Sequence, residues 1–125
     1  MGKIINCPVS VGEIFDKVSI LQLKKEKIKD LSKLKSIDKE LELLVKKLDE
    51  FEGKEKGDFL SQLKGVNLQL WNVEDKLRKN ELEKKFGKAF IEMARSVYLL
   101  NDQRFAIKNE VNNHFKSYVR EVKSY

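Results

Sequence analysis

Cysteine, histidine and proline are scarce in this chain, which has one of each among 125 residues. Cys7 has no partner for a disulfide within the chain, a pattern typical of proteins from reducing compartments. One cysteine and one histidine also fall short of the four ligands that a structural zinc ion takes. His114 stands near the C-terminus without a nucleophile motif, which argues against a Ser-His-Asp triad. The sequence thus points away from disulfide scaffolds, zinc modules and serine hydrolases.

Long apolar runs are also missing. No stretch approaches the roughly 20 apolar residues that a membrane-spanning helix requires. Residues 1–10 contain only short apolar pieces, unlike a secretory signal peptide, and Asn6 stands where a lipid-attachment motif requires a small residue. We therefore expect a cytoplasmic protein without a membrane segment, formed by a single domain over residues 1–125.

Helical periodicity dominates what the sequence does contain. Alternation of the strand type never persists beyond a few residues, which favours an all-α fold. We expect four helices, over residues 11–29, from 36 to the loop at 52–58, over 58–80, and from either 81 or 87 to about 116. The prediction is a four-helix arrangement of two helical hairpins with a long C-terminal helix.

Two local patterns belong to the first hairpin. Ser10 and Glu13 have the spacing of a capping box, in which each side chain bonds to the backbone of the other residue. Apolar residues in the second helix follow heptad spacing, at positions 37, 41, 44, 48 and 51. This stripe suits antiparallel packing on the first helix. It also offers a surface for a partner helix in a homodimer, as does the long last helix.

Polar residues interrupt the apolar stripes of the last helix. One stripe passes through positions 87, 91, 94, 98, 101, 105, 108 and 112, and its neighbour through 90, 93, 97, 100, 104, 107, 111 and 115. Asn101, Arg104, Lys108 and Asn112 all stand on these stripes. Because a buried charge is costly unless it is paired, the helix either borders a polar site or ends its buried portion near Leu100.

Arginine is rare, with only four residues among the 26 basic ones. A lysine-rich chain retains arginine where the planar guanidinium group forms two parallel hydrogen bonds to a carboxylate or a phosphate. For Arg104, inside an apolar stripe, we expect a specific partner. Our predicted ligand-binding residues are Arg78, Asn101, Arg104, Lys108 and Asn112.

The third helix carries an acidic pair, Glu74 and Asp75, beside Trp71. Two interpretations are open. In the functional one, Glu74 and Asp75 are the catalytic acid/base groups and face Arg104 and Lys108. In the structural one, the same charges form an interhelical salt-bridge network around Trp71, and Glu74 pairs with the arginine one turn along the helix. Trp71 itself adjoins an apolar stripe and is predicted to be core.

Glu13 and Asp16 lie one turn apart on the first helix. Together with Glu74 and Asp75 they could form a carboxylate cage for Mg²⁺, as in all-α nucleotide pyrophosphohydrolases. The denser glutamate pattern of those enzymes is absent, and Glu13 is already explained as part of a cap. We therefore assign no metal, and the sequence identifies no cofactor.

Several motifs together carry a family resemblance that spans nearly the whole chain. They are CPVSVGE at residues 7–13, DKVSIL at 16–21, LWNVEDKLR at 70–78, ARSVYLLNDQR at 94–104 and EVKSY at 121–125. The chain resembles a family of short bacterial and phage proteins that is classed as a domain of unknown function. The resemblance implies a one-domain helical protein without an assigned activity. Phe105 stands where this family leads us to expect a small residue.

Three functional hypotheses follow. The first is a binding module or enzyme for a small anionic or phosphorylated ligand, held at a polar site between the third and fourth helices. The second is a homodimeric interaction or scaffold protein without catalytic activity. The third is polyanion or nucleic-acid binding, suggested by the net charge of +6 but lacking any nucleic-acid reading motif. We favour the first over the second and assign no reaction.

Overall fold

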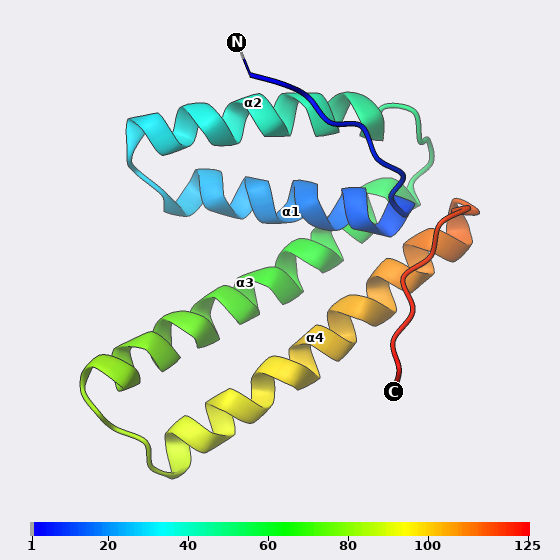
Figure 1. Ribbon diagram of the computed structural model, residues 1–125. Coiled ribbons are helices and arrows are strands. Elements are labelled where there is room, and N and C mark those ends of the chain that lie inside the picture. The colour runs from blue at the N-terminus through cyan, green and yellow to red at the C-terminus, as the bar shows by residue number, and fades with distance from the viewer. Residues whose placement is uncertain (1) are drawn as a thin grey trace.

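The structure, a computed structural model that describes residues 2–125, consists of four α-helices (Figure 1). They are α1 (Val11–Lys27), α2 (Leu31–Leu48), α3 (Glu55–Leu82) and α4 (Lys88–His114). Consecutive helices run antiparallel and form two hairpins, α1–α2 and α3–α4 (Figure 1). Helix α1 lies between α2 and the second hairpin and packs against all three other helices. The predicted all-α class and the four-helix arrangement are thus confirmed.

Helix α1 begins where the sequence predicted, but only half of the predicted capping box forms. The Ser10 hydroxyl accepts a hydrogen bond of 3.1 Å from the backbone N–H of Glu13. The Glu13 carboxylate does not return this bond, because it pairs with the Lys108 ammonium instead. A charged donor attracts a carboxylate more strongly than a backbone amide does. This correction makes Glu13 a tertiary contact rather than a local cap.

Helix α2 begins at Leu31, five residues before the predicted start. Asp30 caps it by accepting hydrogen bonds from the N–H groups of Ser32 and Lys33, at 2.9 and 3.2 Å. Aspartate is a favoured N-cap because it satisfies amides that have no partner in the first turn. The heptad stripe of α2 packs within the chain, where Leu48 is buried in the main core and Leu41, Leu44 and Phe51 pack against it. This stripe is therefore not free for a partner helix.

The apolar core consists of two parts. The main cluster joins all four helices and contains Phe15, Val18, Leu48, Phe59, Leu63 and Val111. A smaller cluster between α3 and α4 contains Val66, Leu70 and Leu100. Polar side chains are buried beside the main cluster, where α1 crosses the second hairpin.

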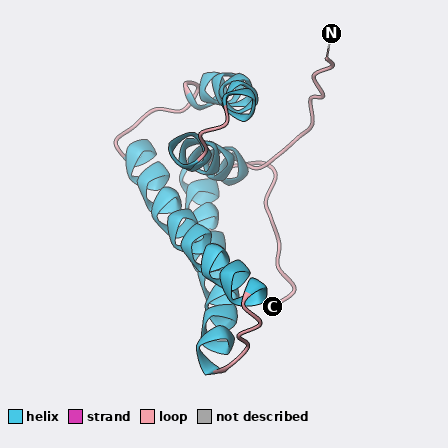
Figure 2. Cartoon of the chain, turned by 90° about the vertical axis from the view of Figure 1, so that its left-hand side faces the viewer, coloured by secondary structure: helices cyan, strands magenta, loops and turns pink. Residues whose placement is uncertain are grey.

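The second hairpin extends well beyond the first (Figures 1 and 2). Helix α4 begins at Lys88, which agrees with the later of the two predicted starts. Ile91 and Tyr98, which we expected on an inward stripe, are 55% and 52% exposed. This expectation was wrong because neither α1 nor α2 reaches the far half of α4. Trp71 is half-buried and belongs to neither core cluster.

No helix within residues 2–125 combines the length and the apolar character that a membrane crossing demands.

Candidate functional site

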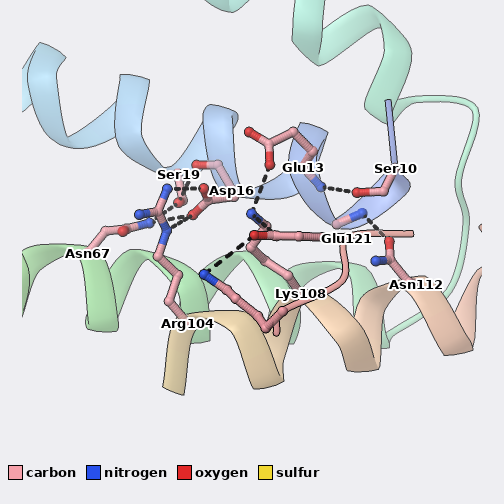
Figure 3. A network of polar contacts seen from close by, with 11 residues as sticks. Ser10, Glu13, Asp16, Ser19, Asn67, Arg104, Lys108, Asn112 and Glu121 are labelled. Atoms are coloured by element: carbon pink, nitrogen blue, oxygen red, sulfur yellow. Dashed lines mark hydrogen bonds and ion pairs between the residues drawn. The ribbon is translucent and has the colours of Figure 1, made fainter. Parts of the chain in front are cut away.

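A buried carboxylate lies at the centre of the polar cluster (Figure 3). The side chain of Asp16 on α1 is completely buried. The guanidinium of Arg104 on α4 binds this carboxylate in a bidentate manner. Its Nε donates to Oδ1 at 2.9 Å, and its Nη2 donates to Oδ2. Such bidentate pairs are the strongest hydrogen-bonded ion pairs in proteins. The specific partner that the sequence predicted for Arg104 is therefore Asp16.

Two further side chains complete the surroundings of Asp16. Asn67 of α3 donates from Nδ2 to Asp16 Oδ1 and to Ser19 Oγ, both at 2.9 Å. The Ser19 hydroxyl in turn donates to the backbone carbonyl of Asp16 at 2.7 Å. The carboxylate raises the pKa of Arg104, and this effect outweighs the opposing effect of burial. Asp16 and Ser19 therefore link α1 to α3 through Asn67, and Asp16 links α1 to α4 through Arg104.

Lys108 forms the second part of the cluster, one turn along α4. Its side chain is only 8% exposed, and its ammonium lies between two carboxylates (Figure 3). Nζ is 2.8 Å from Oε2 of Glu13 and 2.7 Å from Oε2 of Glu121. Burial alone would lower the pKa of Lys108, but the contacts with Glu121 and Glu13 raise it above its ordinary value. Lys108 is therefore charged at neutral pH.

The C-terminal tail, defined here as residues 117–125, contributes Glu121 to this pair and Lys123 beside it. Lys123 Nζ lies 3.7 Å from Glu121 Oε1 and 5.6 Å from the centre of the Phe105 ring. The latter distance is that of a cation–π contact. Phe105, where the family resemblance suggested a small residue, is thus the aromatic surface on which the lysine of the tail rests.

Asn112 anchors the start of α1 rather than lining the site. Its Oδ1 accepts a hydrogen bond of 2.7 Å from the backbone N–H of Gly12. Ser117 of the tail accepts another from the N–H of Val11 at 3.0 Å. These amides belong to the first turn of α1, which has no partners for them within the helix. Asn112 therefore has a structural contact that by itself accounts for its burial.

A small cavity lies beside the Asp16–Arg104 ion pair and the ion pairs of Lys108. Its volume is about 170 Å³, and it lies between α1, α4 and the tail. Its lining is Glu13, Asn101, Arg104, Phe105, Lys108, Glu121 and Lys123. Of the five residues predicted to bind a ligand, the structure brings Asn101, Arg104 and Lys108 together at this cavity. The row of polar residues on α4 therefore borders a polar site, one of the two outcomes that the sequence left open.

The predicted catalytic pair lies elsewhere. Glu74, Asp75 and Arg78 are exposed on α3, and none of them lines the cavity. Glu74 is seven residues beyond Asn67, which corresponds to about 10 Å along a helix. Among the ion pairs found for residues 2–125, none includes these three residues, so the predicted network around Trp71 does not form. A catalytic role for Glu74 and Asp75 remains a prediction.

The carboxylate cage considered for Mg²⁺ does not form either. No group of three or more acidic, histidine or cysteine side chains within the described chain is arranged to hold a metal ion. Asp16 is held by Arg104, and Glu13 by Lys108. Glu13 and Asp16 are therefore each paired with a basic side chain of α4.

Sequence reasoning missed the partners that other segments supply. Asn67 on the third helix was not assigned to the site, although an amide beside an apolar stripe is a usable signal. Ser19, Glu121 and Lys123 belong to the motifs that carry the family resemblance, but a serine on a helix and charged residues in a tail are common at the surface, so the residue types gave them no role. Ser117 had no signal of either kind.

The salt bridge to the tail predicts a pH dependence. Contact with Lys108 holds the pKa of Glu121 below its ordinary value of 4.5, against the opposing effect of burial. A depressed pKa in the folded state stabilises the fold above the pKa of the unfolded chain, and this contribution is lost as the pH falls through the folded pKa. We expect urea unfolding midpoints to show wild type above Glu121→Gln at pH 7, with the gap closing below pH 4.5. A gap that stays constant from pH 7 to 3 would contradict the ion pair.

The helices and the buried charge cluster define a small all-α protein with a polar cavity that both basic and acidic side chains line. Residues 5–125 match a family described as "Family of unknown function (DUF6165)", and the chain belongs to that family. The match confirms the resemblance to a family of unknown function that the motifs indicated. No curated protein and no solved structure matches the chain.

Proposed function

We propose that this protein binds a small anion, of the carboxylate or phosphate class, in the cavity between α1, α4 and the tail. The observation that carries the proposal is the position of Lys108. Its buried side chain lines the cavity, and one of its two carboxylate partners, Glu121, belongs to a segment without secondary structure. An anion that enters the cavity can take the place of that carboxylate. The proposed site thus lies against α1 rather than between α3 and α4, where the sequence placed it.

The charges around the cavity support such an exchange. Three cations, Arg104, Lys108 and Lys123, are balanced by the carboxylates of Glu13, Asp16 and Glu121. Asp16 is buried and receives hydrogen bonds from two helices, so it is firmly held. Within residues 2–125, Glu121 forms ion pairs with Lys108 and Lys123, and its side chain is half-buried. A ligand carboxylate or phosphate therefore competes most easily with Glu121.

The dimensions of the cavity favour a small ligand. Pockets for drug-sized molecules have volumes of about 300–1,000 Å³, and this cavity has about 170 Å³. Asn101 adds a side-chain amide that can donate to an anion, and Phe105 closes one wall. The predicted acid/base residues lie outside the cavity, so the proposal is one of binding and includes no reaction.

Calorimetric titration tests the proposal with inorganic phosphate and with malonate, at low salt. We expect both anions to bind wild type weakly, because each must displace Glu121. Glu121→Gln removes the competing charge and should bind about tenfold more tightly, since one unit charge at about 4 Å is worth about 1–4 kcal/mol between bulk water and a protein surface, and about 1.4 kcal/mol is tenfold in affinity. Lys123→Ala should bind more weakly than wild type, while Lys39→Ala, which removes an exposed lysine on α2, should bind as wild type does.

Two results of this titration would contradict anion binding at the cavity. If neither anion binds wild type or Glu121→Gln, the cavity is not an anion site. Equal binding by Lys123→Ala and wild type would also contradict the proposal, because it would place the anion elsewhere on the basic surface.

A further inference from the structure

The far end of the α3–α4 hairpin has no core of its own. This segment, residues 71–99, is called the arm below. None of its residues is buried, although nearly all of it is helical. Buried residues end at Leu70 on α3 and begin again at Leu100 on α4. Figure 2 shows the arm extending past α1 and α2 without a covering layer.

One face of the arm continues the face on which α1 lies. On α3, Asn67 points to α1, and the helical repeat places Trp71, Glu74 and Arg78 in line with it. On α4, Asn101 lies at the cavity beside α1, and Tyr98 and Ile91 continue its line toward the tip. Large apolar side chains are exposed on this face: Leu82 by 84%, Ile91 by 55% and Tyr98 by 52%. The arm thus presents an apolar face that the first hairpin does not cover.

An isolated pair of helices of this length is only marginally stable in water, since most helical stability comes from packing of the apolar face. A bundle of four helices provides that packing. A second identical arm supplies two helices of the right length and the same apolar residues. Under two-fold symmetry every contact occurs twice: if residue i of one copy contacts residue j of the other, then residue j of the first copy contacts residue i of the second.

The charges on this face suit an antiparallel copy. Glu74 and Arg78 are exposed, lie one turn apart, and form no ion pair within the part of the chain that the structure describes. A two-fold axis midway between them places Glu74 of one copy opposite Arg78 of the other, and the reverse. The same axis brings the aromatic base of the arm, Trp71 and Tyr98, against the aliphatic tip at Leu82 and Ile91. The charges are therefore complementary when the arms run antiparallel.

We propose that the arms of two copies of this chain pack antiparallel as a four-helix bundle, with Glu74 and Arg78 forming reciprocal ion pairs across the two-fold axis. This use of Glu74 and Arg78 differs from the ligand-binding and catalytic roles that the sequence suggested. It is also independent of anion binding, because the cavity beside Lys108 lies outside the arm.

Sedimentation equilibrium of the full chain tests the proposal, over about 1 to 200 µM at moderate salt. We expect wild type to dimerise in this range. Glu74→Arg and Arg78→Glu should each weaken the dimer by about tenfold or more, because each places like charges opposite one another twice. The double variant Glu74→Arg/Arg78→Glu should restore dimerisation to within about threefold of wild type.

Two further variants distinguish dimerisation through this face from non-specific hydrophobic association. Ile91→Glu should abolish the dimer, whereas Leu43→Glu, on an exposed and similarly apolar position of α2, should leave it intact. Circular dichroism checks that each variant is folded. A wild type that remains monomeric at 200 µM would overturn the proposal. So would a dimer that resists Ile91→Glu, or one that the charge swap fails to restore, since either would place the interface elsewhere.

Discussion

Replacing Arg104 with methionine is expected to destabilise the fold by about 3–5 kcal/mol, the cost of leaving a buried charge without its partner. The Asp16 side chain is fully buried and receives two hydrogen bonds from Arg104. Without the guanidinium, only Asn67 remains to compensate the carboxylate. Urea unfolding at pH 7 and 25 °C, followed by circular dichroism, measures the loss of free energy of unfolding.

Two companion variants identify the cause. Arg104→Lys should recover little, because an ammonium cannot reproduce the bidentate fork. Asp16→Asn combined with Arg104→Met should be more stable than Arg104→Met alone, since the uncompensated charge is gone. A loss below about 1 kcal/mol for Arg104→Met, the range of an exposed ion pair, would show that Asp16 is accessible to water in solution.

The second large effect is expected from Gly12→Ala, at about 3 kcal/mol of lost stability, as for overpacking of a tight contact. A Cβ at residue 12 would lie 2.5 Å from the backbone carbonyl oxygen of Lys108 and 3.0 Å from Oδ1 of Asn112. Neither atom can yield easily, because one is backbone and the other accepts the hydrogen bond of the Gly12 N–H. Helix α1 would have to move away from α4, which would also strain the two ion pairs nearby. Thermal and urea unfolding measure the change.

Gly65→Ala provides the matched control. Gly65 also lies within a helix, and a Cβ added there meets no atom within 4 Å. Alanine is the better helix former, so this variant should gain about 1 kcal/mol. If Gly12→Ala were as stable as Gly65→Ala, α1 and α4 would not approach each other closely at Gly12 in solution.

The sequence predicted the helices well where apolar residues repeat with a clear period. On α3, for example, Leu63, Val66 and Leu70 follow one another at helical spacing, and all three are buried. The polar residues on α4 were recognised for the same reason, because Arg104 and Lys108 broke a period that should have been apolar. Periodicity thus identified both the fold class and one side of the polar cluster.

The partners of those residues could not be predicted in this way. Asp16 contacts Arg104 across 88 positions of sequence, and a helical period says nothing about which neighbouring helix faces a given residue. One of the two interpretations left open had Glu74 and Asp75 facing Arg104 and Lys108, but Glu74 lies two turns beyond Asn67, the residue of α3 that contacts Asp16. Glu121 lies in a segment without a period, so its inward position depends on tertiary contacts alone.

The exposed half of α4 has a related explanation. The apolar stripe continues through Ile91 and Tyr98, although no element of the chain covers them. A stripe shows that a face is suited to packing, not that a partner for it lies within the same chain. The uncovered part of this stripe is the face that the proposed second copy would cover.

Anion binding at the cavity can be observed residue by residue through amide chemical shifts. Uniformly ¹⁵N-labelled protein would be titrated with phosphate at a fixed, low ionic strength, with chloride as the control. We expect saturable shifts confined to residues 101–108 and to the tail around Glu121, larger in Glu121→Gln than in wild type. Shifts that grow linearly without saturation, or that gather on the exposed lysines between residues 25 and 35, would rule out binding at the cavity.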